Sequence, residues 1–465
     1  MYYLPFGFGK YNVYLILICG LVLFAANSES YGIGYIVPVA ECELNLNTYT
    51  KGILTSTNII GTMCSCAIWG YLSDFKGRKK LLMINLVLSS ISGFLAAFTK
   101  SFWGFCTLRL INGICISCPA AVTSSTRAKA MAWGTSFVAL AMISLPALGW
   151  LLLQSSIDLE FLSLHLNNWR AYMLVNSIPS ILVTLALHRL PESPKYLYHC
   201  GKTEETLKIL KKMYSCNTGK SEDSFSVLSL DEKVLEINEN KRSVCQGLTQ
   251  QLIPLFKQPL LTYTLVSCFM QAGAFSVSAG LYFWYPDIIK QISLSEQTSM
   301  TVCDALSVSH NSDDDINCNT IDDSVFIQNI IIGVTYLLAY ATWGAVVKLL
   351  GTRMFFMSCM GVAALSTAAI CILSSRVLIN IFFIASFALS GITASVINAW
   401  VVEIFPTQIC GIALCIVLTI GRLGSVLSSF LVGIMLEWNC ITTFLLYALN
   451  LLGCVGLSLL LPQTS

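Results

Sequence analysis

Twelve apolar segments constrain this chain most, because each is close to the roughly twenty residues that a helix needs to cross a bilayer. The chain is therefore predicted to be an all-α membrane protein with twelve transmembrane helices. The segments lie near residues 12–37, 53–72, 81–99, 102–123, 130–153, 171–190, 260–285, 325–347, 354–374, 377–401, 411–436 and 440–461.

Composition excludes a water-soluble globular protein. Hydrophobic residues make up 55% of the 465 residues and charged residues only 11%, whereas soluble domains carry about 25% charged residues. A net charge of +2 indicates no nucleic-acid partner, and the four histidines and 19 cysteines have no metal-site spacing. Most of the cysteines lie in apolar segments, where cysteine acts as a small hydrophobe. We expect no metal, no cofactor and no enzymatic activity, and a chain embedded in lipid as a monomer.

A short charged loop, residues 70–80, sets the predicted orientation. Its basic residues include Lys76, Arg78, Lys79 and Lys80, and short basic loops stay in the cytoplasm. Most other lysines and arginines fall on the same side under this assignment. Both termini are therefore predicted to be cytoplasmic, in the plasma membrane or an intracellular vesicle.

Two long polar segments divide the chain. Residues 191–258 are expected to link an N-terminal six-helix bundle, 1–190, to a C-terminal one, 259–465, with a short amphipathic helix from Thr203 to Tyr214. Residues 286–323 form an acidic loop on the opposite, oxidising side. We expect a disulfide between Cys303 and Cys318, with two free thiols as the alternative, and a solvated loop rather than a calcium site.

The two halves repeat a glycine spacing. Gly70 and Gly77 are seven residues apart in the loop between the second and third helices, and Gly344 and Gly351 are seven apart in the corresponding loop of the second half. With six helices on each side of a long linker, this echo predicts two pseudo-symmetric bundles of a duplicated transporter fold.

Four motifs resemble one family. The sequence Gly70-Tyr-Leu-Ser-Asp-Phe-Lys-Gly-Arg-Lys-Lys80 resembles the signature loop of the major facilitator superfamily. Leu190-Pro-Glu-Ser-Pro194, Asn168-Trp-Arg170 and Glu403-Ile-Phe-Pro-Thr407 resemble motifs of its sugar porters, organic ion transporters and synaptic vesicle two-related proteins. The large loop between helices seven and eight is typical of the synaptic vesicle two-related branch. The resemblance implies the twelve-helix fold of this superfamily.

The same resemblance implies a cytoplasmic gate. Contacts of the signature loop across the two halves would close that face and break when the protein opens inward, with Glu192 and Glu403 as candidate acidic partners. The alternative is that the loop only orients the protein. Cys410 stands where the family carries an arginine, which weakens the expected charge network. The predicted gating residues are Gly70, Asp74, Gly77, Arg78, Lys79, Glu192 and Glu403.

Ionisable residues within apolar segments suggest function, because a charge in hydrocarbon is costly. Glu29 in the first segment and Arg109 in the fourth are expected to pair, as an acid and an arginine do in the proton-coupled sugar porters that this chain resembles. Separation of the pair would let Glu29 take up a proton. The alternative is a static pair that helps the helices pack.

Candidate solute-binding residues lie in the seventh, tenth and eleventh segments, where aromatic side chains can stack on a ring or a cation. They are Gln271, Phe275, Asn398, Trp400 and Arg422. The sequence therefore predicts a secondary active transporter that moves a small organic, charged solute by alternating access, coupled to protons. The alternative is a non-transporting receptor or vesicle component that acts through the 286–323 loop.

Overall fold

The computed structural model of the chain describes residues 9–123, 128–155, 159–161, 164–225, 253–294, 301–304, 306, 323–406 and 409–462. Cys318 lies outside these residues. Gly70 and Asp74 lie in a helix, but the side chain of Asp74 is not among those described.

All twelve predicted segments are helical, which confirms the all-α fold class. Within the described residues, nine helices are long and apolar enough to cross a membrane, and the chain is an integral membrane protein. The first half contains α1 (Lys10–Tyr31), α2 (Ile33–Ala40), α3 (Thr48–Lys76), α4 (Arg78–Ala96), α5 (Phe102–Thr123), α6 (Ala128–Leu153) and α7 (Asn168–His188). The second contains α11 (Leu260–Phe275), the π-helical η4 (Ser276–Leu281), α12 (Tyr282–Leu294), α14 (Asp323–Leu350), α15 (Thr352–Ala369), α16 (Arg376–Ile404), α17 (Cys410–Trp438) and α18 (Cys440–Ser458).

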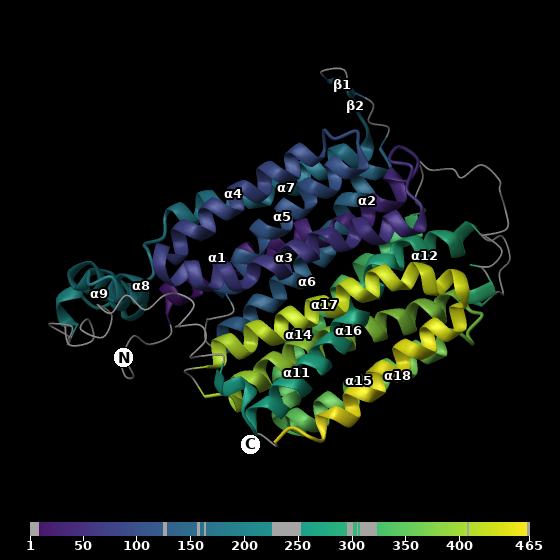
Figure 1. The fold of residues 1–465 in the computed structure, drawn as a ribbon. Coiled ribbons are helices and arrows are strands. Elements are labelled where there is room, and N and C mark those ends of the chain that lie inside the picture. The colour runs from purple at the N-terminus through teal and green to yellow at the C-terminus, as the bar shows by residue number, and fades with distance from the viewer. Residues whose placement is uncertain are drawn as a thin grey trace.

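The two halves lie side by side, and their long helices run in roughly the same direction (Figure 1). Two helix pairs make most of the contact between them, with α3 packed on α17 and α6 packed on α14. We call this contact the seam. One end of the bundle holds the turn at Gly77 and is called the Gly77 end. The other holds the start of α3 and is called the Lys51 end.

The short helices that connect the two halves in the sequence lie at the Gly77 end (Figure 1). They are α8 (Pro194–His199), α9 (Thr203–Thr218), η1 (Glu222–Ser224) and η3 (Ile253–Phe256). The predicted amphipathic helix is confirmed as α9, which buries Thr206, Leu210 and Tyr214 on one face. The end of α9 docks on the start of α1 through Asn217, which accepts a hydrogen bond from the Tyr11 backbone N–H at 3.0 Å. The domain boundaries at 190 and 258 stay predictions.

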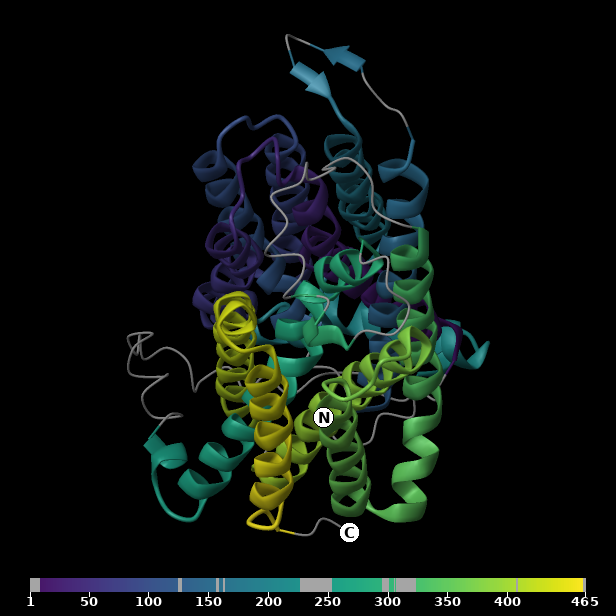
Figure 2. The same cartoon turned by 90° about the vertical axis from the view of Figure 1, so that its right-hand side faces the viewer.

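At the Lys51 end, Arg170 fastens the loop after α2 to α7. Its guanidinium donates to Glu43 and to the carbonyl of Ala97, the latter at 2.6 Å, and it lies over the Trp169 ring. The Trp169 indole N–H donates to the same Glu43 carboxylate at 2.7 Å. The Asn168-Trp-Arg170 motif therefore joins loops of the first half. A small antiparallel ribbon, β1 (Leu159–Phe161) and β2 (Leu164–Leu166), projects beside it (Figure 2).

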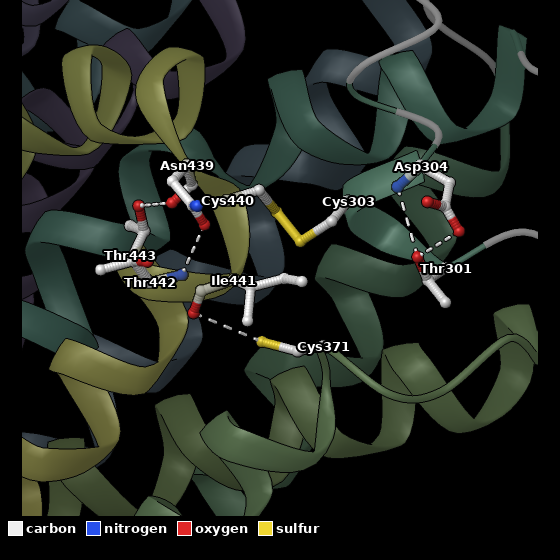
Figure 3. Close-up of a disulfide and its surroundings, with 9 residues drawn as sticks. All are labelled: Thr301, Cys303, Asp304, Cys371, Asn439, Cys440, Ile441, Thr442 and Thr443. Atoms are coloured by element: carbon white, nitrogen blue, oxygen red, sulfur yellow. Dashed lines mark hydrogen bonds between the residues drawn. A yellow bond between two sulfur atoms is a disulfide. The ribbon is translucent and has the colours of Figure 1, made fainter.

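The disulfide predicted for the 286–323 loop is wrong in its partner. Cys303 is bonded to Cys440 at the start of α18, 137 residues away, with the two Cα atoms 5.4 Å apart (Figure 3). A cysteine forms one disulfide, so Cys318 cannot be the partner of Cys303. Helix packing brings the start of α18 next to Cys303, and sequence proximity does not reveal that. Cys42, in the first half, is also disulfide-bonded.

Candidate functional site

The first helix of each half is interrupted. At Gly32, between α1 and α2, the interruption is a single residue whose backbone angles stay helical (φ −56°, ψ −25°), and the π-helical η4 separates α11 from α12. π-Helical turns within α-helices occur frequently at functional sites. Interrupted helices at corresponding positions of two repeats mark the solute site in transporters of this kind. The two interruptions therefore point to the part of the seam beside them.

Aromatic side chains join the two interrupted helices across the seam. The ring of Tyr31 stacks on Phe283 with centroids 5.5 Å apart. The hydroxyls of Tyr35 and Tyr282 lie 3.3 Å apart within hydrogen-bonding distance. These contacts join the two halves next to the two interruptions.

Gln271 lies on α11, whose main neighbours all belong to the second half. It is 0% exposed, and neither its amide nitrogen nor its amide oxygen has a hydrogen-bond partner among the described residues. It lies against α17, since a Cβ at Gly421 would stand 2.6 Å from Gln271 Cγ and equally close to the Phe275 ring. A buried, unpaired amide costs about 1–3 kcal/mol. Such a group is expected where a ligand supplies the missing partners.

Arg422 follows Gly421 and is half-buried. Its Nη1 is buried without a partner, and its charge acts on the Tyr31 hydroxyl and the Cys66 thiol of the first half. No carboxylate of the described residues forms an ion pair with it. The structure thus brings Gln271 and Phe275 together against Gly421 of α17, while Arg422, the next residue, acts on groups of the first half.

The remaining two solute candidates, Asn398 and Trp400, lie on α16. Asn398 on α16 has a buried, unpartnered Oδ1, but no hydrogen bond among the described residues joins it to Gln271 or Arg422. Trp400 is 1% exposed, packs edge-on against Phe356 of α15 and donates to the carbonyl of Pro462 at 3.3 Å. These contacts lie within the second half, and they give Trp400 a packing role.

Glu29 is buried among four helices of the first half. Its carboxylate accepts hydrogen bonds from Ser89 of α4 at 3.1 Å, from Ser180 of α7 at 2.7 Å and from the Asn112 amide of α5. Neutral donors rather than a cation thus satisfy the carboxylate.

The predicted pair of Glu29 and Arg109 is adjacent but is not an ion pair. Arg109 Nη2 donates to the backbone carbonyl of Glu29 at 2.7 Å, and its Nε is buried without a partner. The guanidinium and the carboxylate interact electrostatically, at more than hydrogen-bonding distance. The two charged groups are therefore close enough to interact electrostatically, but each has its own hydrogen-bond partners.

At the Gly77 end, Glu192 caps the start of α4. Its carboxylate accepts from the backbone N–H of Lys79 at 2.9 Å and of Lys80 at 3.4 Å, where the positive end of a helix favours an anion. Gly77 has φ +93°, and a Cβ there would stand 2.8 Å from Glu192 Oε2. Glycine, which has no Cβ, tolerates the positive φ and leaves room for the Glu192 carboxylate.

The expectation that Glu192 pairs across the two halves is wrong. Glu192, at the start of the linker, binds a loop of the first half, and the Lys79 ammonium also binds there, to the carbonyls of His188 and Leu190. Glu403, the other expected partner, is exposed and has no ion pair among the described residues. A charged gate that joins the halves at this end stays a prediction, to which the Arg78 and Asp74 side chains would have to contribute.

Comparison with known families decides the class. Residues 14–308 match the family described as sugar (and other) transporters. The chain belongs to the sugar (and other) transporter family. This confirms the predicted membership of the major facilitator superfamily, near the sugar porters.

Relatives within this family include synaptic vesicle glycoproteins. The chain is 26% identical over 333 residues to human synaptic vesicle glycoprotein 2A and 25% identical over 334 residues to mouse synaptic vesicle glycoprotein 2C. The first match covers 63% of this chain and 44% of the relative. The chain therefore spans less than half the length of the relatives it matches.

Solved structures of the family share the fold. A D-xylose-proton symporter superposes with a TM-score of 0.65 at 18% identity, covering 98% of this chain and 99% of that one. A partially occluded inward-open form of the xylose transporter XylE from E. coli gives 0.68 at 17% identity, covering 96% and 98%. At these identities the likeness concerns the fold.

The sequence did not predict a group of charged side chains that meet at the Lys51 end. Lys51 binds Asp287 of the second half at 3.3 Å and Glu41 of the first at 2.9 Å. Lys290 of α12 donates to the carbonyl of Pro38 at 3.2 Å. Each charge stands near the end of an apolar segment, where lone charges are ordinary. Only their positions next to an interrupted helix could have marked them.

Proposed function

We propose that this chain is a secondary active transporter that moves a small organic, charged solute across the membrane by alternating access, with protons as the coupled ion. The solute would bind in the seam at the interruptions of the first and seventh helices. The Gly77 end and both termini would face the cytoplasm, as the distribution of basic loops predicts.

The unpartnered amide of Gln271 carries this proposal. It is wholly buried in α11, which leads into the π-helical η4, and it lies against Gly421 of α17. A buried amide without partners weakens a fold, so its presence here favours a site that a solute completes. The guanidinium of Arg422, which forms no ion pair among the described residues, supports an anion as that solute, because a charge in the membrane interior needs a counter-charge.

Uptake into proteoliposomes tests the proposal. The panel contains an organic anion, a neutral compound of the same shape and a matched cation, each measured with and without an imposed proton gradient. We expect gradient-dependent uptake of the anion. A protein that binds a solute without moving it would instead support the alternative, a non-transporting receptor or vesicle component.

A further inference from the structure

Four charged residues meet at the Lys51 end, in the contact between the halves. The Lys51 ammonium lies between the carboxylates of Glu41, in its own half, and Asp287, on α12 of the other half. Gln291 holds the second oxygen of Asp287 at 3.2 Å. Lys290, one turn of α12 beyond the charge pair, reaches the carbonyl of Pro38. We call these four residues, Glu41, Lys51, Asp287 and Lys290, the charge cluster.

Three of the four members of the cluster are buried, Glu41 is partly exposed, and the charges balance. Lys51, Asp287 and Lys290 are each 7% exposed, and two cations face two anions. The carbonyl of Pro38 lies in the last turn of α2, where the helix dipole favours a cation and where carbonyls lack intrahelical partners. Because removal of one partner leaves another buried charge unpaired, such a cluster holds its elements firmly.

Two of its contacts cross from one half to the other. They are Lys51 to Asp287 and Lys290 to Pro38, and both connect α12 to the first half. The Tyr35–Tyr282 and Tyr31–Phe283 contacts lie next to them, toward the Gly77 end, on the same interrupted helices. The Lys51–Glu41 pair, in contrast, lies within the first half.

We propose that the charge cluster is the latch that holds the Lys51 end closed, and that its opening is the step that exposes the seam from that end. The proposal rests on the alternating access proposed above. When α12 moves away, Lys51 keeps Glu41 as a partner, so its charge stays satisfied in the open form. Asp287 and Lys290, which are one turn apart on α12, exchange their partners in the first half for water. This asymmetry makes Lys51 the fixed part of the latch and α12 the moving part.

Distance measurements across the Lys51 end test the latch without any solute. Spin labels carried by unnatural amino acids replace two exposed serines at this end, Ser101 before α5 and Ser375 before α16, and double electron–electron resonance reports their separation. We expect one short distance in the parent protein. In Asp287→Asn, the ratio of open to closed molecules is expected to rise about tenfold or more, giving a second, longer distance.

Lys51→Met provides a second variant, because it removes the cation that both carboxylates share. We expect the same longer distance as in Asp287→Asn. Size-exclusion profiles in detergent confirm folding, and if one variant fails to fold the other still decides.

The matched control is Glu43→Gln. It breaks the Arg170–Glu43 ion pair, which lies at the same end but within the first half, so the distance should not change. Unaltered distances in Asp287→Asn and Lys51→Met, or an equal change in Glu43→Gln, would overturn the latch. Failure of uptake in every protein would refute the transport function instead, since these distances need no transport.

Discussion

At the scale of single residues, buried polar groups separate structural from functional roles. Arg170 is buried with a carboxylate and a backbone carbonyl as partners, and its place in the fold is explained. Gln271 is buried with none among the described residues. Unsatisfied polar groups are few in native proteins, and each calls for an explanation.

Replacing Gln271 with Met should reduce uptake while the protein keeps or gains stability. The change removes an unpaired amide at nearly constant volume, which is neutral or stabilising, but it also removes the groups that would bind the solute. We expect uptake to fall about tenfold or more, measured in proteoliposomes beside the unfolding temperature in detergent.

Asn85→Leu is the control for Gln271→Met. Asn85 is also wholly buried with an Oδ1 that has no partner among the described residues, but it lies on α4, which packs mainly on α5 and α7 rather than on the helices η4 and α17 that pack against α11. Uptake per folded molecule should stay unchanged in this control. Unchanged uptake in Gln271→Met would remove Gln271 from the solute site.

Replacing Glu29 with Gln should uncouple uptake from protons. The carboxylate accepts from Ser89, Ser180 and Asn112, and an amide cannot accept from all of them, so stability should fall by about 1–3 kcal/mol. Exchange of solute across the membrane should continue, whereas the response to an imposed proton gradient should disappear.

Ser180→Ala serves as the comparison for Glu29→Gln. It removes one donor and keeps the carboxylate, so it should lower stability and preserve the gradient response. A gradient response that survives in Glu29→Gln would leave Glu29 with the static role that the sequence also allowed.

At the scale of elements, the glycine echo between the halves has a backbone counterpart. Gly77 precedes α4 with φ +93°, and Gly351 precedes α15 with φ +78°. Both helices begin after the same kind of turn, in a region where residues with a Cβ are strained. The surroundings differ, since a Cβ at Gly351 would have nothing within 4 Å.

Because of this difference, alanine substitutions at Gly77 and Gly351 can separate the cost of backbone strain from the cost of displacing the Glu192 carboxylate. Gly77→Ala and Gly351→Ala should each cost about 1–2 kcal/mol from backbone strain. Gly77→Ala should cost about 1 kcal/mol more, because the new methyl group displaces the Glu192 carboxylate that caps α4. Unfolding temperatures in detergent measure both losses.

A double-mutant cycle checks the assignment. In a Glu192→Ala background the extra cost of Gly77→Ala should vanish, since there is no carboxylate left to displace. An extra cost that persists would place the second effect elsewhere than in the Glu192 cap.

At the scale of the whole molecule, the disulfide connects parts of one half, whereas the Lys51–Asp287 ion pair connects the two halves. The Cys303–Cys440 disulfide joins two parts of the second half (Figure 3). The Lys51–Asp287 pair joins the two halves. A transporter that rocks its halves can keep the first link throughout its cycle, but it must break the second.

Cys303→Ser and Cys440→Ser should therefore lower stability and spare transport. Each should cost about 2–4 kcal/mol, and the double variant no more than either single one, because all three remove the same bond. Uptake per folded molecule should be retained. Peptide mapping without reduction should recover Cys303 linked to Cys440, and a map that pairs Cys303 with Cys318 would contradict the structure.

The sequence by itself determined the membrane setting, the twelve helices, the duplicated halves and the family. Each depends on the length of an apolar run or on a motif a few residues long, which neighbours along the chain decide. Only the tertiary structure decided the partners of single side chains. Glu192 meets Lys79 of its own half across 113 residues, Cys303 meets Cys440 across 137, and Lys51 meets Asp287 across 236. Such pairs depend on which helices pack together and in which rotation, and no local pattern of the chain carries that information.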